Sequence, residues 1–518
     1  MKETSSAAHF YGKPIASAEA FTGSRYYHCF ADQKNSADYA YAFGVNEFVL
    51  CASAYQPWID KYPGSTAGGK HYCLNRNNTY WEYSRPFWDY QARCSALMRK
   101  GVPVVDICVY LGQNPPVKLV TYRLPEIPEG YDFDVCTAEA LVGRTMAVDG
   151  RLTLPTGISY SLLVIQRNND MPLHVLRHIA GLVKGGVIVC GPRPDGSDSL
   201  KDKAESEEYR ALVDELWGEL TTVSQIRKVG KGKIYENIPL SEVLKYENIR
   251  PDIAIKSGNT AKDKVYFVHR RLSDADVYFL NNHSDRAFHD TIRLRTDARQ
   301  AEYWDAVTGQ RYMIPVKASG EKGMLLNLTL APRESGFIVT SNNQATGLLP
   351  RIADVQETIT PIEGSWNVYF DPRWGGPGKV VFDELIDWTV HADTGIRYYS
   401  GTVVYHKELN LAMPAQNERL LLRFPRLGSL ARVWVNGKEV VTVWCSPWEA
   451  DITSYVHEGK NNLKIEVVNS LMNRMIGDAS LPESERFTYA YPQIATPTDK
   501  LVPSGIMEQL NLVYRQCQ

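Results

Sequence analysis

The sequence lacks the features that mark nucleic-acid-binding and membrane-spanning proteins. Lys and Arg number 57 against 59 Asp and Glu, so the net charge of −2 provides no field that would attract nucleic acid or an anionic membrane. No run approaches about 18 uninterrupted apolar residues, which excludes a transmembrane helix. We therefore expect neither a nucleic acid nor a membrane as partner.

Motifs for zinc, nucleotide and nucleophile chemistry are also missing. None of the nine cysteines forms a CxxC pair, so we expect free, mostly buried thiols. The patterns GxxxxGK[ST], GxGxxG and HExxH do not occur, and Gly157–Ser161 (GISYS) is not a GxSxG nucleophile elbow. The first residues hold no apolar core of a signal peptide. That predicts either a cytoplasmic protein or a Met1 that is not the natural start.

The length of 518 residues predicts roughly three or four domains, and the patterning predicts a multidomain chain of α/β and all-β parts. Residues 1–100 alternate strands and helices around a long loop, Tyr55–Asn78, which is an α/β arrangement with parallel strands. Two strands cannot close a sheet, so we interpret this segment as the C-terminal part of a (β/α)8-type barrel. Its expected elements are strands at Pro14–Ala20 and Asn46–Ala52 and helices at Asp32–Phe43 and Tyr80–Lys100.

Residues 101–245 have the pattern of a flavodoxin-like α/β domain, in which apolar strands alternate with amphipathic helices. The expected strands are Val102–Tyr110, Ser161–Gln166 and Val187–Cys190, and the expected helices are Asp132–Leu141, Pro172–Lys184 and Glu207–Trp217.

The remaining chain switches to period-2 patterns. Residues 246–345 predict a small β-sandwich, within which we interpret the basic cluster His269–Arg271 as a solvated face. Residues 350–518 predict a galactose-binding-like jelly-roll β-sandwich, with a hairpin turn at Asn436-Gly437 because both residues accept positive φ.

Glu19 is the candidate catalytic residue. It stands at the carboxyl end of a predicted strand, the edge at which barrels hold catalytic groups, and apolar neighbours there can tune a carboxyl group for acid or base work. The alternative is a glutamate at a strand end that simply faces water.

Polar and aromatic residues that suit sugar binding follow the next strand. Planar amide and guanidinium groups pair with vicinal hydroxyls, and aromatic faces cover the C–H surface of a sugar. The alternative is an Asn-rich turn with Thr79 as helix N-cap and Trp81 in the core. The candidate substrate-binding residues are Tyr55, Gln56, Trp58, Asn75, Arg76, Asn77 and Trp81.

Taken in order along the chain, these motifs resemble glycoside hydrolase family 106, the α-L-rhamnosidases, over the later part of such an enzyme. The C-terminal motifs look like the sugar-binding jelly roll that is also found in family 2 glycosidases. The matching pieces are Ala7–Thr22 (AAHFYGKPIASAEAFT), Tyr55–Trp58 (YQPW), Asn75–Trp81 (NRNNTYW), Asp132–Arg144 (DFDVCTAEALVGR), Trp374–Pro377 (WGGP), Tyr398–Gly401 (YYSG), Val435–Lys438 (VNGK) and Asn473–Asp478 (NRMIGD).

The resemblance implies a glycosidase that hydrolyses terminal α-L-rhamnosyl or related deoxysugar linkages in plant or microbial polysaccharides. It also implies inversion by two carboxyl groups, a calcium ion in the active site, and an extracellular or periplasmic location. Glu19, in the AEAFT motif, would be one active-site carboxylate, as acid, base or calcium ligand. The partner carboxylate would lie on barrel strands upstream of Met1, so we expect an N-terminally truncated form.

Two departures from the family pattern stand out. Cys51, Ser53 and Tyr55 occupy positions where the family carries histidines and an aromatic residue, which leaves room for another deoxysugar. The ending Pro503–Leu510 (PSGIMEQL) also differs from the family's usual ending. The alternative function is a non-catalytic carbohydrate-binding or structural remnant of such an enzyme.

Overall fold

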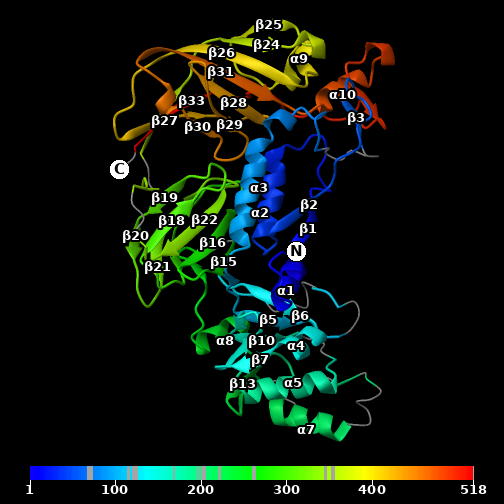
Figure 1. The fold of residues 1–518 in the computed structure, drawn as a ribbon, viewed down its shortest axis with the longest axis vertical. Coiled ribbons are helices and arrows are strands. Elements are labelled where there is room, and N and C mark those ends of the chain that lie inside the picture. The colour runs from blue at the N-terminus through cyan, green and yellow to red at the C-terminus, as the bar shows by residue number, and fades with distance from the viewer. Residues whose placement is uncertain are drawn as a thin grey trace.

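The computed structural model describes residues 1–516 except 67–73, 114–116, 120–125, 167–169, 195, 198, 200–205, 220–222, 259–263, 344–346 and 352–355. The jelly roll, the β-sandwich with one α/β part beside it, and a second α/β part follow one another along the long axis of the molecule (Figure 1). No helix in these described ranges is long and apolar enough to cross a membrane.

The first α/β part consists of a parallel strand pair and the two helices that follow the strands. The two strands and two helices predicted within residues 1–100 are all confirmed, with shorter bounds for the strands. Phe30 of α2 stacks on Phe87 of α3 at 4.8 Å between ring centroids, and these helices run side by side against the β-sandwich and the jelly roll (Figure 1). The elements are β1 (Ser17–Ala20), α2 (Phe30–Tyr41), β2 (Glu47–Leu50) and α3 (Arg85–Met98).

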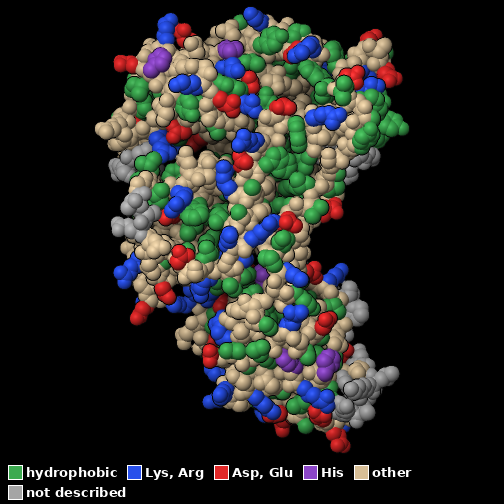
Figure 2. Space-filling model, in the orientation of Figure 1, with side chains coloured by type: hydrophobic (Ala, Val, Ile, Leu, Met, Phe, Trp, Pro, Cys, Tyr) green, Lys and Arg blue, Asp and Glu red, His purple; other side chains and the backbone are tan. Residues whose placement is uncertain are grey.

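The strand pair β1–β2 leaves apolar side chains at the surface. Within the described residues no further strand pairs with either edge. Val49 is 58% exposed, and Leu50 and Ile15 are exposed as well. Apolar side chains are visible at the surface of this middle part of the molecule in Figure 2.

The second α/β part is a six-stranded sheet in the order β12-β13-β11-β10-β5-β6, parallel except for β12. Numbered along the chain, its parallel strands run 2-1-3-4-5, which is the flavodoxin-like order. The strands are β5 (Ile107–Tyr110), β6 (Phe133–Cys136), β10 (Leu162–Ile165), β11 (Ile188–Cys190), β12 (Gln225–Val229) and β13 (Gly232–Glu236).

Alternating side chains of these strands bury both faces of the sheet, as a doubly covered parallel sheet requires. Cys108 and Tyr110 point to the layer of α1, α4, α5 and α7, whereas Ile107 and Val109 pack against α8. The helices are α1 (Lys2–Phe10), α4 (Ala138–Arg144), α5 (Leu173–Lys184), α7 (Ser206–Trp217) and α8 (Leu240–Tyr246).

Two sequence predictions in this part are wrong. Val102–Tyr110 is not one strand, because β4 (Val102–Pro103) pairs with the β-sandwich and β5 begins only at Ile107. Asp132–Leu141 is not a helix, because Phe133–Cys136 forms β6 and the helix begins after Thr137, whose hydroxyl caps the Ala140 amide.

The β-sandwich packs a four-stranded sheet (β14-β17-β21-β20) on a six-stranded sheet (β19-β18-β22-β16-β15-β4). The strands are β14 (Ile253–Ile255), β15 (Val265–Arg271), β16 (Ala275–Asn282), β17 (Phe288–Leu294), β18 (Gln300–Trp304), β19 (Arg311–Ile314), β20 (Val316–Ala318), β21 (Met324–Leu330) and β22 (Ser335–Ser341).

Of the basic cluster at the end of β15, Arg271 is exposed as expected, but His269 and Arg270 are not on a solvated face. His269 is fully buried between two carboxylates, with Nδ1 at 2.9 Å from Asp252 and Nε2 at 3.1 Å from Asp276. Arg270 is buried too, and it donates to the carbonyls of Lys100 and Gly101 in the turn before β4. The ion pairs of His269 and the backbone hydrogen bonds of Arg270, which a sequence does not reveal, compensate for this burial.

The jelly roll packs a four-stranded sheet (β23-β33-β27-β30) on a six-stranded sheet (β25-β24-β26-β31-β28-β29). The predicted hairpin is confirmed, with φ of 53° at Asn436 and 77° at Gly437. The strands are β23 (Glu357–Pro361), β24 (Trp366–Phe370), β25 (Gly378–Phe382), β26 (Thr402–Leu411), β27 (Glu418–Arg423), β28 (Leu430–Val435), β29 (Lys438–Val443), β30 (Glu449–Asp451), β31 (Gly459–Val468) and β33 (Asn511–Gln516).

Smaller elements complete the described chain. A three-stranded sheet consists of β7 (Met146–Val148), β8 (Arg151–Thr153) and β9 (Ser159–Tyr160). The jelly-roll segment also carries the short helices α9 (Thr394–Arg397) and α10 (Met472–Asp478). A parallel pair joins β3 (Pro63–Ser65) to β32 (Tyr489–Tyr491), so the N-terminal and C-terminal segments meet in one sheet. The predicted domain boundaries stay predictions.

Candidate active site at the ends of β1 and β2

Glu19 lies near the carboxyl end of β1, opposite Val49 in the parallel register. Its side chain is exposed, and Thr22 donates a hydrogen bond to its Oε1 at 2.7 Å. The Cys51 amide donates to the Ala20 carbonyl at 3.1 Å, so the chain leaves both strands at the same edge. The carboxylate is therefore open to a ligand from the solvent side and oriented by one neighbouring hydroxyl.

Gln56 and Asn77 hold the loop after β2 together. Gln56 Nε2 donates to the Ser65 carbonyl at 2.7 Å, and the Ser65 amide donates back to Gln56 Oε1 at 2.9 Å. Asn77 Nδ2 donates to the same Oε1 at 3.3 Å and to the Lys61 carbonyl at 3.0 Å. Both side chains are buried, so the polar groups that we expected on a sugar here bind the protein backbone.

Residues 74–76 connect the loop before α3 to the loop that directly follows β2. The Leu74 amide donates to the Ala52 carbonyl, and Arg76 donates to the carbonyls of Gln56 and Trp58, each at 3.3 Å. Asn75 is buried, and its Oδ1 accepts from the Asn77 amide. Its Nδ2 is buried without a hydrogen-bond partner in the described part of the chain. This amide is a donor that nothing described in the protein uses.

The aromatic candidates differ in their surroundings. Trp58 packs edge-on against Tyr489 of β32 at 5.0 Å, and Lys61 Nζ lies 4.1 Å from the Tyr489 ring centroid. Tyr55 is 82% exposed, and Trp81, in the 3-10 turn Trp81–Tyr83, is 38% exposed. The structure thus brings together Gln56, Trp58, Asn75, Arg76 and Asn77. Part of the predicted loop, residues 67–73, lies outside the described residues.

The alternative reading of residues 75–81 is right about an Asn-rich turn, which the Asn78 amide closes on the Asn75 carbonyl at 3.0 Å, but it is wrong about Thr79 and Trp81. Ser84, not Thr79, is the residue before α3, and the Thr79 hydroxyl donates to the Asn469 carbonyl of the jelly roll at 2.6 Å. Trp81 is not a core residue, since more than a third of its surface is exposed.

Residues near the C-terminus pack against the N-terminal loops of the candidate site, which the sequence did not predict. Met475 and Ile476 of α10 pack with Ile494 into a cluster that also takes in Tyr26 and Tyr62 from the N-terminal loops. Tyr62 meets Trp374 edge-on at 5.5 Å. The aromatic run Phe487–Tyr491 was the one signal in the sequence, but no local pattern tells which distant loop it covers.

Thiol and phenol groups beside α2 are poor candidates for acid–base work. Burial raises the pKa of Cys29 to about 12, and burial also raises the pKa of Tyr80. Both groups therefore stay protonated at neutral pH. Glu19, by contrast, is an exposed carboxylate at this edge.

A calcium ion at this edge would need its oxygen ligands from the same residues. Calcium takes six to eight oxygen ligands, several of them carboxylates. Among the residues that the structure describes, no group of three or more His, Cys, Asp or Glu side chains could hold a metal ion. The residues around Glu19 therefore do not fit calcium by themselves, and no chemical step is derived through it.

Comparisons with known proteins match both halves of the chain. The family model described as alpha-L-rhamnosidase, of glycoside hydrolase family 106, matches residues 1–317. The model described as the sugar binding domain of glycosyl hydrolases family 2 matches residues 353–514, and a domain of that description implies carbohydrate binding.

A solved structure of a rhamnosidase from Novosphingobium sp. PP1Y is similar to nearly the whole chain. The TM-score is 0.88 at 28% identity, over 98% of this chain and 48% of that one. A putative beta-glucuronidase of Formosa agariphila is 23% identical over 93% of this chain and 59% of its own length. The chain thus spans about half the length of the proteins that it matches.

Proposed function

Because the chain belongs to the alpha-L-rhamnosidase family, glycoside hydrolase family 106, we propose that it is part of an enzyme that hydrolyses terminal α-L-rhamnosyl or related deoxysugar linkages. The observation that carries the proposal is the similarity of 98% of the chain to a solved rhamnosidase. The segment β1–α2–β2–α3 is then the C-terminal part of a (β/α)8-type barrel. Its exposed apolar strand pair, with Val49 at the surface, agrees with further strands packing there.

The proposed chemistry is inversion by two carboxyl groups. One carboxyl group protonates the leaving glycosidic oxygen, and the other activates a water on the opposite face of the sugar. The two carboxyl groups lie roughly 6.5–9.5 Å apart, which leaves room for that water. Glu19 supplies one of them, because its carboxylate is exposed at the carboxyl edge of a parallel strand, where α/β barrels hold catalytic groups. The second carboxylate is assigned to segments of the longer relatives that this chain does not contain.

The substrate contacts are proposed to come from the loops after β2. Asn75 Nδ2 is a buried donor without a described partner, and Tyr55 and Trp81 present exposed aromatic faces. Gln56, Arg76 and Asn77 fix the loop that carries Trp58, so their contribution to binding is to preorganise it. Calcium stays an implication of the family, to be tested by metal analysis of the purified protein.

The decisive experiment replaces Glu19 by Gln and follows hydrolysis of p-nitrophenyl α-L-rhamnopyranoside. Wild-type and variant chains are assayed alone and in a form that carries the further segments of the longer relatives. Loss of a catalytic carboxyl group should lower kcat by about 10²–10⁴-fold with an unchanged melting temperature. Proton NMR of the first product reports whether the anomeric configuration is inverted.

Glu242→Gln, an exposed carboxylate of α8, is the matched control and should keep wild-type turnover. Turnover of Glu19→Gln equal to wild type would remove Glu19 from the mechanism. Retention of configuration would contradict the inverting scheme.

The second candidate function is carbohydrate binding without catalysis, which the match of residues 353–514 to a sugar binding domain favours. Saturable quenching of tryptophan fluorescence by methyl α-L-rhamnopyranoside, with no hydrolysis in either form, is the result expected of it. Hydrolysis by the form with the further segments would exclude it as the whole function.

A further inference from the structure

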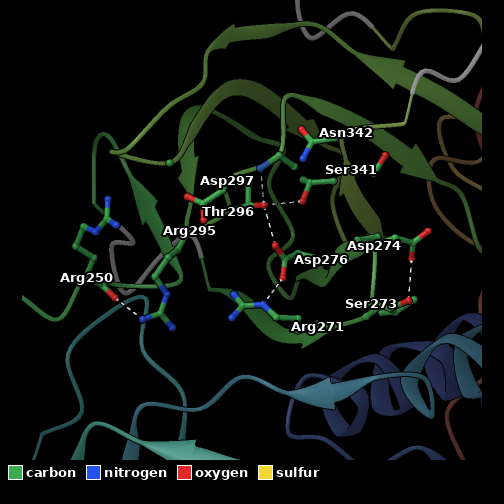
Figure 3. Close-up of a pocket in the computed structure, with 15 residues that line it drawn as sticks. Arg250, Arg271, Ser273, Asp274, Asp276, Arg295, Thr296, Asp297, Ser341 and Asn342 are labelled. Atoms are coloured by element: carbon green, nitrogen blue, oxygen red, sulfur yellow. Dashed lines mark hydrogen bonds and ion pairs between the residues drawn. The ribbon is translucent and has the colours of Figure 1, made fainter. Parts of the chain in front are cut away.

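A polar cavity of about 410 Å³ lies at one end of the β-sandwich. The turn between β15 and β16, the loop between β17 and β18, and the end of β22 surround it (Figure 3). Loops at the end of a rigid sandwich are a common position for binding sites, and the volume lies within the range of small-ligand pockets. Neither family match nor the reaction proposed above assigns a role to it.

The floor of the cavity is a fixed network around Asp276. The Arg271 guanidinium donates to Asp276 Oδ1 at 2.9 Å, and Thr296 donates to Oδ2 at 2.8 Å. His269 contacts Oδ1 from below at 3.1 Å. Burial raises the pKa of Asp276, but the hydrogen bonds of His269, Thr296 and Arg271 outweigh it and lower the pKa to about 2. Asp276 is thus an ionised, immobile acceptor.

Arg295 is locked on the neighbouring wall. Its guanidinium contacts Asp252 Oδ1 at 2.6 Å and Asp106 Oδ2 at 2.7 Å, and it donates to the Arg250 carbonyl at 3.0 Å. Two segments distant in sequence, one with Asp106 and one with Arg250 and Asp252, hold this side chain, so the wall does not have to be ordered when a ligand enters.

The charges of the lining cancel. Three arginines (Arg250, Arg271 and Arg295) face three aspartates (Asp274, Asp276 and Asp297). Arg271 and Arg295 are already paired with carboxylates, so a second anion would compete with those pairs. A net anionic ligand is therefore disfavoured.

The rim offers donors beside acceptors. Asp297 and Asn342 are both exposed, and Asn342 Oδ1 accepts from the Arg299 amide, so the NH₂ group of Asn342 is the part of this side chain that can donate to a ligand. A carboxylate, an amide and a guanidinium edge in one cavity match vicinal hydroxyl groups, each of which both donates and accepts. The lining residues include no aromatic ring, so recognition would rest on hydrogen bonds.

We propose that this cavity is a second carbohydrate site, which binds a neutral sugar unit through its hydroxyl groups. The site would hold a polysaccharide chain beside the β-sandwich while another part of the protein acts on it. Without a stacking ring, a single sugar unit should bind with a dissociation constant on the order of a few millimolar.

The test measures binding of methyl α-L-rhamnopyranoside, methyl α-D-glucopyranoside and D-glucuronate to the full chain by saturation-transfer NMR. Asp297→Ala combined with Asn342→Ala removes one acceptor and one donor at the rim, and Ser273→Trp fills the cavity from its edge. Lys317→Ala, an exposed residue of β20, is the matched control.

Saturable binding of a neutral sugar that falls at least fivefold in the double variant and in Ser273→Trp, but not in Lys317→Ala, is the expected result. Equal signals in wild type and both cavity variants would overturn the assignment, because the sugar would then bind elsewhere. No saturable binding of either neutral glycoside, or at least tenfold tighter binding of D-glucuronate, would overturn it too. None of these outcomes depends on whether the chain hydrolyses rhamnosides.

Discussion

Replacing His269 by Gln should destabilise the β-sandwich in a way that depends on pH. His269 is fully buried, stacks on Tyr278 at 4.1 Å, and has a carboxylate against each ring nitrogen, Asp252 at Nδ1 and Asp276 at Nε2. Two carboxylates facing both nitrogens require two N–H donors, so the ring is held as an imidazolium. Burial lowers the pKa of His269, but the hydrogen bonds with Asp252 and Asp276 outweigh this effect, and the net pKa is raised.

The size of the destabilisation depends on the charged groups that lose His269 as a partner in the variant. Removing one partner of a buried ion pair costs about 3–5 kcal/mol. Asp252 keeps Arg295 and Asp276 keeps Arg271, so the lower end, about 3 kcal/mol, applies. Because the folded-state pKa is raised, the stabilisation is fully present below the unfolded pKa of about 6.5 and is lost as pH rises through the folded-state pKa. The wild-type protein should therefore lose stability on the alkaline side, and His269→Gln should not show this loss.

The assay is native-state hydrogen exchange of β15 and β16 together with thermal melting, each from pH 5.5 to above the folded-state pKa. At pH 5.5, His269→Gln should lower the melting transition that includes the β-sandwich by about 10 °C. His289→Gln, on the exposed face of β17, is the control and should leave the transition in place. A change of less than about 2 °C at pH 5.5, or the same pH dependence in wild type and variant, would refute the reasoning.

Two further predictions concern the loop site and the thiols. Gly64→Ala should destabilise the loop after β2 by about 1–2 kcal/mol and raise KM in the catalytic assay, because Gly64 has a φ of +73° and a Cβ there meets Gln56 Oε1. Gly112→Ala, in open space at a similar φ, is the control for backbone strain. Equal KM values in both variants would contradict the prediction. Cys108 and Cys136, buried with Sγ atoms 3.6 Å apart, should react with Ellman's reagent at least about 100-fold more slowly than the partly exposed Cys51, since burial raises the pKa of Cys108. Mass spectrometry after labelling identifies each thiol, and labelling of Cys108 at the rate of Cys51 would contradict the burial argument.

Local periodicity predicted the elements whose stability is decided by an amphipathic face. The predicted helices Pro172–Lys184 and Glu207–Trp217 are α5 and α7, each within one residue, because the apolar stripe of each matches the layer that it covers. Asp132–Leu141 failed because strand and helix follow each other without a break, and the helical spacing of Ala138–Leu141 was extended backward through β6. The capping hydroxyl of Thr137 marks the true boundary.

The candidate site was predictable as a set of loops but not as a set of contacts. Gln56 and Asn77 have the residue types of a sugar site, yet a sequence does not show that the Ser65 backbone and Lys61 carbonyl occupy their polar groups. The burial of His269 could not be predicted for the same reason, because the sequence does not show the contacts that its ring makes. Its carboxylate partners include Asp252, which lies in the bend directly before β14, and only the folded chain brings the two side chains together.

The pairing of β3 with β32 bears on how this architecture could be recombined. Tyr489 covers Trp58 from the jelly-roll side, and the Thr66 hydroxyl donates to the Pro492 carbonyl at 3.0 Å. A chimera that replaces residues 353–514 by a jelly roll from another glycosidase would lose this cover along with the domain. We therefore expect the N-terminal loops and the jelly roll to be inherited as one unit. An engineered chimera would have to keep Tyr489–Tyr491 together with the N-terminal loops that this segment covers.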